Sequence, residues 1–163
     1  MKLLVIGTQL SGKTTLARYL REHTHVIVSE VDEEIVRENG GTWPEDNVYK
    51  DTVIIPRIYE RIASMESVIF FANYFAPVSQ VEIFRSQGFS VANLRLGRDE
   101  MLRRNIHRMQ HEGYEDATPW IDGQITNHNE LRRLGLVDIE VDATLPTAEI
   151  AHALMQFAAM SQT

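Results

Sequence analysis

The sequence of 163 residues contains no cysteine, which excludes disulfide bonds, a thiol nucleophile and any zinc site built on cysteine. No apolar run approaches the roughly 18 residues of a membrane-spanning helix. The apolar run Leu3–Ile6 is also too short for the core of a signal peptide. We therefore expect a protein that is neither exported nor inserted into a membrane.

Lysine is scarce, since it occurs only as Lys2, Lys13 and Lys50, and arginine carries the rest of the positive charge. The formal net charge is −7, which disfavours nucleic acid as a partner because its binding needs many cationic contacts to phosphates. Hydrophobic residues make up 44% of the chain and charged residues 24%, as in globular proteins. We expect a single domain over residues 1–163, and the composition leaves the oligomeric state open.

What the sequence does contain is a glycine-rich loop within LLVIGTQLSGKTTLARYL. Gly7, Gly12, Lys13 and Thr14 fit the pattern G-x-x-x-x-G-K-[ST] of a phosphate-binding loop, between a short aliphatic run and an amphipathic segment. Glycines allow successive N–H groups to point at anionic oxygens, and the start of a helix adds a positive dipole end. The predicted nucleotide-binding residues are Gly7, Thr8, Gln9, Leu10, Ser11, Gly12, Lys13, Thr14 and Thr15.

Each functional group in this loop has a separate task when the ligand is ATP with Mg²⁺. The ammonium of Lys13 supplies a full charge toward the β- and γ-phosphates, so we predict that it is catalytic. The hydroxyl of Thr14 is suited to bind Mg²⁺. We therefore expect ATP and Mg²⁺ as cofactors, and a protein that uses ATP is expected in the cytoplasm.

Strand-like and helix-like segments alternate along the rest of the chain, which predicts an α/β fold with a parallel sheet covered on both faces. Ser29 is predicted to begin a helix through a capping box with Asp32, and Pro56 to kink or break another. The predicted strands are residues 2–6, 26–29, 67–75, 89–96 and 137–142. The predicted helices are residues 12–23, 29–40, 45–64, 77–88, 99–112, a short helix ending near 133, and 147–160, with 113–123 irregular.

Two other classes of phosphate-binding protein fit poorly. Motor-type ATPases place an acidic residue at the end of a later apolar strand, and the segment VIFFANYF ends without one. A switch GTPase would carry Asn-Lys-x-Asp, which ITNHNE does not match.

The whole chain resembles the small P-loop kinases of metabolites and nucleotides: shikimate kinase, gluconate kinase and adenylate kinase. Besides the loop, the resemblance rests on the segments SEVDEEIVRENGG, LGRDEMLRRNIHRM and VDIEVDATLPTAEIAHAL. It implies a three-layer P-loop kinase fold with a five-stranded parallel sheet and a lid insertion. The acceptor-binding segment would cover about residues 31–65 and the lid about 107–128.

Two acidic residues match the Asp-x-Asp that ends the second strand in shikimate-kinase-like proteins. The resemblance implies that Glu30 lies near Mg²⁺ and that Asp32 contacts the acceptor, where a carboxylate orients a hydroxyl and accepts its proton. Asp32 is equally suited to cap a helix, and both readings stay open. Glu33 and Glu34 are expected to be solvated acids of the first helical turn.

Arginines gather after the fourth predicted strand. Arg104 and Arg108 are four residues apart and share a helix face, and in the resembling kinases arginines here reach over the triphosphate. We predict that both are catalytic. Arg103 is expected to pair with Asp99 on the solvated side of the helix.

The acceptor side departs from the family. Adenylate kinases require an arginine just after the third strand, and the segment FFANYFAPVSQ contains none. Asn73 and Tyr74 there indicate a hydroxyl-rich or neutral acceptor. Arg57 is predicted to hold an anionic acceptor, or to lie on the surface with Arg61. The predicted substrate-binding residues are Asp32, Arg57 and Asn73.

The sequence therefore predicts a kinase that transfers the γ-phosphoryl group of Mg·ATP to a hydroxyl of a small metabolite. Two alternatives remain: a nucleoside or nucleotide kinase, and a nucleotide-binding regulator with little kinase activity.

Overall fold

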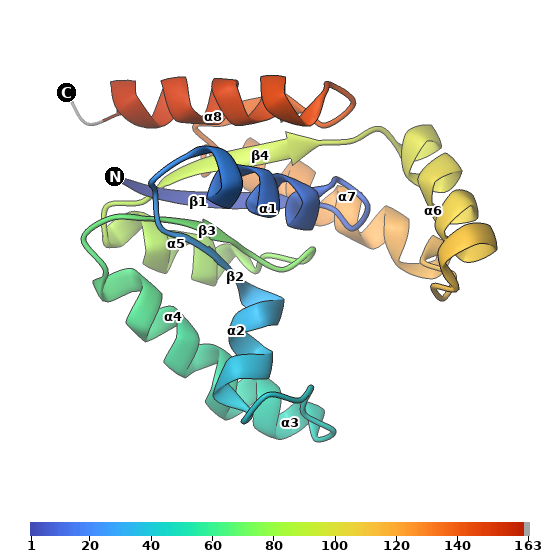
Figure 1. Cartoon of the computed structure of the whole chain (residues 1–163), viewed down its shortest axis with the longest axis horizontal. Coiled ribbons are helices and arrows are strands. Elements are labelled where there is room, and N and C mark those ends of the chain that lie inside the picture. The colour runs from blue at the N-terminus through green and yellow to red at the C-terminus, as the bar shows by residue number, and fades with distance from the viewer. Residues whose placement is uncertain (162–163) are drawn as a thin grey trace.

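A computed structural model of the chain describes residues 1–161, and these form a five-stranded parallel sheet with helices on both faces (Figure 1). The strand order is β2-β3-β1-β4-β5. The strands are β1 (Lys2–Gly7), β2 (Val28–Glu30), β3 (Val68–Phe71), β4 (Ser90–Arg95) and β5 (Ile139–Asp142). The predicted α/β class and sheet are confirmed.

The helices are α1 (Lys13–His23), α2 (Val31–Glu38), α3 (Asn47–Tyr49), a π-helix η1 (Lys50–Ile54), α4 (Ile55–Ser64), α5 (Val78–Ser86), α6 (Arg98–Glu112), α7 (Thr118–Arg133) and α8 (Thr147–Met160). Helices α1 and α8 cover one face of the sheet, and α4 and α5 lie on the other (Figure 1). This gives three layers.

Alternating strand residues fill the two core layers. In β1, Leu3 and Val5 pack with α1 and α8, whereas Leu4 and Ile6 pack on the opposite face with α4 and α5. Phe70 and Phe71 of β3 point to opposite layers and are both fully buried. A central strand buried on both faces reads as a continuous apolar run, which is why β1 and β3 were recognisable in the sequence.

The predicted capping box at Ser29 is wrong. Strand β2 extends to Glu30, so α2 begins at Val31 and Ser29 still belongs to the strand. The Ser29 hydroxyl is buried and donates to a Glu34 carboxylate oxygen instead. Glu34 itself is 6% exposed and accepts from Arg37 and Arg61, so its predicted solvated position is also wrong.

Two helix predictions need correction as well. Pro56 does not break the segment 47–64, because the wide π-helical turn η1 precedes it and Pro56 falls in the first turn of α4, where its missing N–H is tolerated. Helix α7 is long rather than short, because it starts at Thr118 and includes Gly123. Among residues 1–161, no helix is long and apolar enough to cross a membrane.

Candidate active site

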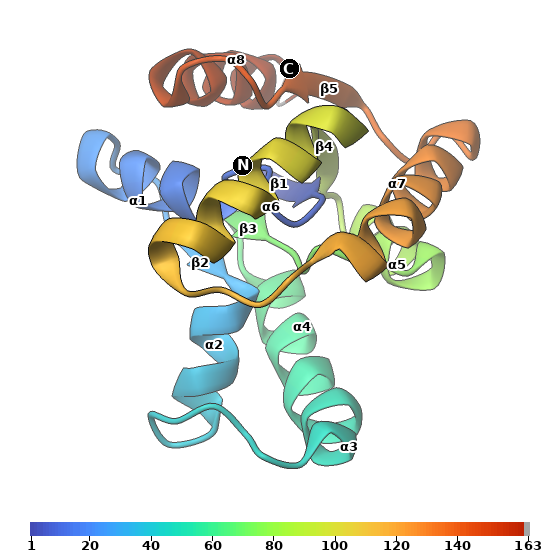
Figure 2. The same ribbon diagram turned by 90° about the vertical axis from the view of Figure 1, so that its right-hand side faces the viewer.

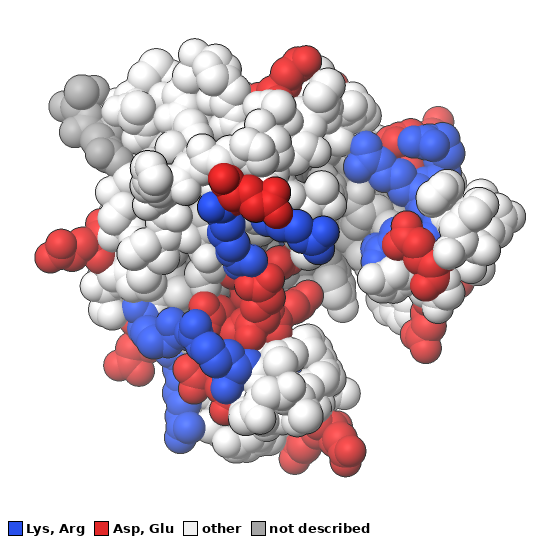
Figure 3. Space-filling view, in the orientation of Figure 1, with Lys and Arg blue, Asp and Glu red and all other residues white. Residues whose placement is uncertain are grey.

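The carboxyl ends of the central strands open onto one cavity of about 710 Å³. Its walls come from the loop after β1, the start of α2, the segment after β3, and α6 with the residues that follow it. Figure 2 views the molecule with α6 in front of the sheet, and Figure 3 shows a hollow between the α6 side and the α2–α4 side. Strand β1 lies between β3 and β4, and ligands of parallel α/β sheets bind at the carboxyl edge where the strand order reverses.

Two glycines shape the loop after β1. A Cβ atom on Gly7 would lie 2.6 Å from the Ser11 hydroxyl oxygen, so a larger residue cannot fit without a shift. Gly12 has a φ of 85°, which glycine adopts without strain. Gly12 is also the N-cap of α1, and no side chain of the described residues caps this helix. The first-turn N–H groups of α1 are therefore suited to bind an anion.

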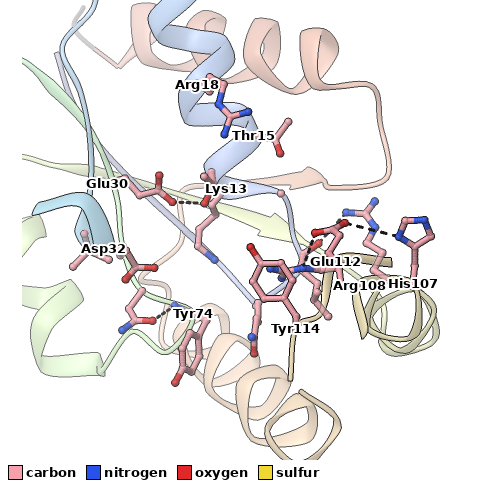
Figure 4. A pocket seen from close by; sticks show the side chains of 18 residues that line it. Lys13, Thr15, Arg18, Glu30, Asp32, Tyr74, His107, Arg108, Glu112 and Tyr114 are labelled. Carbon is pink, nitrogen blue, oxygen red and sulfur yellow. Dashed lines mark hydrogen bonds and ion pairs between the residues drawn. The ribbon is translucent and has the colours of Figure 1, made fainter. Parts of the chain in front are cut away.

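Lys13 occupies the centre of the cavity (Figure 4). Its Nζ donates to the carbonyl oxygens of Gly7 at 2.6 Å and Thr8 at 3.0 Å. Burial lowers the pKa of Lys13 to about 8, while the charges of Asp32 and Glu30 act in the opposite direction. An ammonium held by two neutral carbonyls is poorly compensated, so an incoming phosphate would gain from binding it.

Thr14 and Glu30 bring oxygen ligands together beside Lys13. The Thr14 hydroxyl donates to Oε1 of Glu30 at 2.5 Å. Glu30 is 6% exposed, and its Oε2 has no hydrogen-bond partner among the described residues. Burial raises the pKa of Glu30, and the bond from Thr14 opposes that rise. A hydroxyl and a carboxylate are the oxygen ligands that Mg²⁺ prefers, so this pair fits the predicted metal role.

Asp32 lies in the first turn of α2 and lines the same cavity. Partial burial raises the pKa of its carboxyl group, and the positive charges of Lys13 and Lys50 lower it. Its side chain is exposed on the cavity side, and α2 has no side-chain cap among the described residues. The helix-capping interpretation of Asp32 therefore loses its support, and the carboxylate is available to a ligand.

Arg104 joins three parts of the site. Its guanidinium donates to the carbonyl oxygens of Leu10 in the loop and Ala143 after β5, each at 3.0 Å, and to Glu100 at 2.8 Å. It therefore braces the loop against α6 while lining the cavity. Arg103 points away and pairs with Glu100 rather than with Asp99, which corrects the predicted pair.

Arg108 stacks on an aromatic ring at the far side of the cavity (Figure 4). Its Cζ lies 3.6 Å from the ring centroid of Tyr114, and its Nε lies 3.7 Å from Glu112. His107 lies 4.0 Å from the other oxygen of Glu112. A guanidinium that already lies flat on one ring is suited to pack against a second ring or to bind phosphate oxygens.

The predicted acceptor residues separate in the structure. Asn73 lines the cavity after β3, and its side-chain oxygen accepts from the Tyr74 backbone N–H at 2.7 Å. Arg57 is exposed on α4 and does not line the cavity. Its neighbour Arg61 binds Glu34 and Glu38. The cavity therefore brings Asp32 and Asn73 together and leaves Arg57 outside.

One face of α7 anchors both loops of the cavity. Gln124 accepts from the Gln9 N–H at 2.6 Å, and so holds the phosphate-binding loop. Asn127 makes two bonds of 3.1 Å with the backbone of Ala76. The buried ring of His128 lies 3.0 Å from the Tyr74 carbonyl oxygen, and burial lowers its pKa. The walls are therefore fixed from behind by residues that do not line the cavity.

Several lining residues were not predicted from the sequence. Arg18 lies one helical turn after Thr14 on α1, so the spacing of four residues was the available signal. Tyr114 comes from a segment without periodicity, and only its contact with Arg108 reveals it. The other lining residues that the sequence did not single out are Ala72, Val31 of the predicted acceptor-binding segment, and His107 and Glu112 of the predicted lid.

Histidines four residues apart on α6 do not form a metal centre. His107 and His111 stack on each other with ring centroids 4.4 Å apart. Residues 1–161 contain no group of three or more histidine or acidic side chains that could hold a metal ion.

Solved structures with this arrangement of strands and helices cover nearly the whole chain. Shikimate kinase from Aquifex aeolicus has a TM-score of 0.74 at 17% identity, over 96% of this chain and 95% of its own. Shikimate kinase from Acinetobacter baumannii, solved in complex with shikimate, has a TM-score of 0.75 at 17% identity, over 98% and 93%. This chain has the fold of the small P-loop kinases.

A gluconokinase from Sinorhizobium meliloti 1021 shares this P-loop kinase fold, with a TM-score of 0.64 at 19% identity over 99% of this chain and 93% of its own. No family model and no curated protein matches the sequence. At these identities the likeness concerns the fold alone.

Proposed function

We propose that the chain is an ATP-dependent small-molecule kinase, which transfers the γ-phosphoryl group of Mg·ATP to a hydroxyl group of a small metabolite. The observation that carries this proposal is that one cavity holds both the Lys13 loop, which follows β1, and the Asp32 carboxylate, which follows β2. A phosphate-binding loop alone is common to many proteins, whereas a carboxylate facing it is what an attacking hydroxyl needs.

In the proposed reaction, the acceptor oxygen forms a bond to the γ-phosphorus. The bond from that phosphorus to the β–γ bridging oxygen breaks, and ADP keeps the electron pair. Asp32 orients the acceptor hydroxyl and accepts its proton, while Lys13 stabilises the charge of the transferring group. Thr14 and Glu30 would hold Mg²⁺, which neutralises phosphate charge when bound.

Arg104 and Arg108 would act on the nucleotide from α6, over the loop of residues 7–15. The predicted lid, about residues 107–128, starts on this helix. Because Gln124 and Asn127 tie α7 to the cavity walls, the part before α7 would close and exclude water so that ATP is not hydrolysed. Asn73 would contact the acceptor. The proposal needs no nucleic acid and no membrane, and it implies a protein that works in the cytoplasm, where ATP is available.

The direct test is acceptor-dependent formation of ADP by purified protein with ATP, Mg²⁺ and a panel of hydroxyl compounds. We expect Mg·ATP to stabilise the fold as well, because a ligand at 100 times its Kd adds about 2.7 kcal/mol to the free energy of unfolding. Differential scanning fluorimetry with and without Mg·ATP measures that stabilisation.

The possible results separate the proposal from its alternatives. Turnover with nucleosides or nucleotides only would identify a kinase of that class. Stabilisation by Mg·ATP without acceptor-dependent ADP would favour a nucleotide-binding regulator. Absence of both effects would contradict every nucleotide-based function.

Replacing Arg104 with alanine is expected to raise the KM for ATP about tenfold, because charge-assisted bonds to Leu10 and Ala143 that hold the loop are lost. Arg103→Ala is the matched control on the same helix, since its exposed pair with Glu100 contributes little. Steady-state kinetics of both variants tests the difference. Equal KM values for the two would show that Arg104 does not support nucleotide binding.

A further inference from the structure

We infer, resting on the proposed kinase function, that the acceptor is an uncharged polyhydroxy compound and that carboxylated or phosphorylated acceptors are poor substrates. The inference comes from how charge is divided between the two halves of the cavity, and from how firmly the acceptor half is held.

The cationic side chains of the cavity lie on its nucleotide side. They come from the loop with α1 and from α6: Lys13, Arg18, Arg104 and Arg108. The opposite wall is formed by the start of α2 and the segment after β3, and none of its described lining residues is a lysine or an arginine. This acceptor wall consists of Val31, Asp32, Ala72, Asn73 and Tyr74, and Glu30 at the end of β2 separates it from Thr14.

The basic residues nearest this wall are engaged elsewhere. Arg37 and Arg61 both bind Glu34, a buried carboxylate that would lose one of its two cationic partners if either arginine moved to a ligand. Arg57 is exposed on α4, outside the cavity. Outside the cavity, Lys50 also acts on Asp32, and its Nζ lies 3.0 Å from the side-chain oxygen of Asn47 and over the ring of Trp43.

Lys50 is close enough for its charge to lower the pKa of Asp32, but it does not line the cavity. Its charge is shared with Asp51, 3.5 Å away. The acceptor wall therefore carries one carboxylate, Asp32, because Glu30 beside it accepts from Thr14 and would hold Mg²⁺.

The part of the acceptor wall that follows β3 is also held in place, so a small movement of this segment would not supply a cation. Asn127 fixes the backbone of Ala76 at both its N–H and its carbonyl oxygen, and His128 contacts the Tyr74 carbonyl oxygen. Residues 72–76, between the end of β3 and these contacts, include no basic residue that could move into the cavity.

An anionic group placed on this wall would face the Asp32 carboxylate and no lysine or arginine of the wall itself, which makes its binding unfavourable. A hydroxyl group, in contrast, finds hydrogen-bond partners on this wall. The carboxylate oxygens of Asp32 accept hydrogen bonds, while the amide of Asn73 and the phenol of Tyr74 are able to donate and accept. A compound with several hydroxyl groups and no charge matches these partners.

The test compares pairs of acceptors that differ only in an anionic group. Suitable pairs are a hexitol and the corresponding hexonate, a cyclitol and a cyclitol carboxylate, and a nucleoside and its 5′-monophosphate. Acceptor-dependent ADP formation gives kcat/KM for each member. We expect the neutral member of any reactive pair to exceed its anionic partner by about 100-fold.

The outcomes distinguish this inference from the proposed function. A preference for the anionic member of a reactive pair would overturn the neutral acceptor and leave the kinase intact. Binding of Mg·ATP with no ADP formed from any member would overturn the kinase and the acceptor inference together. A neutral preference in every reactive pair supports both.

An introduced cation gives a second, independent readout. Asn73→Arg should improve the anionic member of a reactive pair relative to the neutral one by about tenfold, because it places a guanidinium on the acceptor wall. Ile83→Arg is the matched control, since Ile83 is exposed on α5 and does not line the cavity. An unchanged ratio in a folded Asn73→Arg variant would mean that the acceptor does not contact this wall.

Discussion

Replacing Lys13 with methionine is expected to reduce phosphoryl transfer by roughly 1000-fold or more, because the ammonium is the cation at the centre of the cavity. The folded protein should keep or increase its thermal stability. Burial lowers the pKa of Lys13 to about 8, because it disfavours the charged form of the side chain. A methionine of similar length would not carry this cost of burying a charge. Turnover kinetics and thermal unfolding, measured on the same preparation, test the two effects separately.

Lys2→Met provides a matched control for the loss of lysine. The Lys2 ammonium also donates to two backbone carbonyl oxygens, those of Ala63 and Gln87, but it lies at the start of β1. We expect this variant to lose some stability and to keep its turnover. Near-normal transfer by Lys13→Met would rule out the proposed role of the loop.

Replacing Asp32 with asparagine is expected to lower kcat by about 100- to 10,000-fold, because the amide cannot accept the proton of the acceptor hydroxyl. The KM for ATP should change little, since Asp32 lies on the acceptor wall. Steady-state kinetics with ATP and acceptor varied independently separates these parameters.

The control for Asp32 is the next residue along the helix. Glu33→Gln removes a carboxylate that is 54% exposed and pairs with Arg21 on the surface, so kcat should stay within about twofold of the original value. If the Asp32 and Glu33 variants were equally active, Asp32 would have no part in proton transfer.

The sequence predicted well where local spacing dictates geometry. The loop of residues 7–15 follows from the positions of Gly7, Gly12 and Lys13, and the structure explains the two glycines by a close approach and a positive φ. The pairing of Thr14 with Glu30 was accessible only through resemblance to a kinase family, because these residues are sixteen apart and meet through the β1–β2 crossover.

The sequence predicted poorly where tertiary contacts override local preference. Ser29 has the spacing of a capping residue, yet pairing of β2 with β3 extends the strand past it and buries its hydroxyl against Glu34. Arg57 looked suited to an acceptor because of its segment, and only the packing of α4 shows that it faces away from the cavity. No pattern in the sequence indicated that Tyr114 would stack on Arg108.

Helix α7 has a consequence for the kinetics of a two-substrate reaction. Gln124 holds the backbone of Gln9 beside the proposed donor, and three residues further along Asn127 holds the backbone of Ala76 near the proposed acceptor. One helix would therefore set the distance between the two substrates. Neither substrate would have to bind first in order to form the binding site of the other. Random-order addition is the kinetic behaviour that such a pre-aligned frame allows.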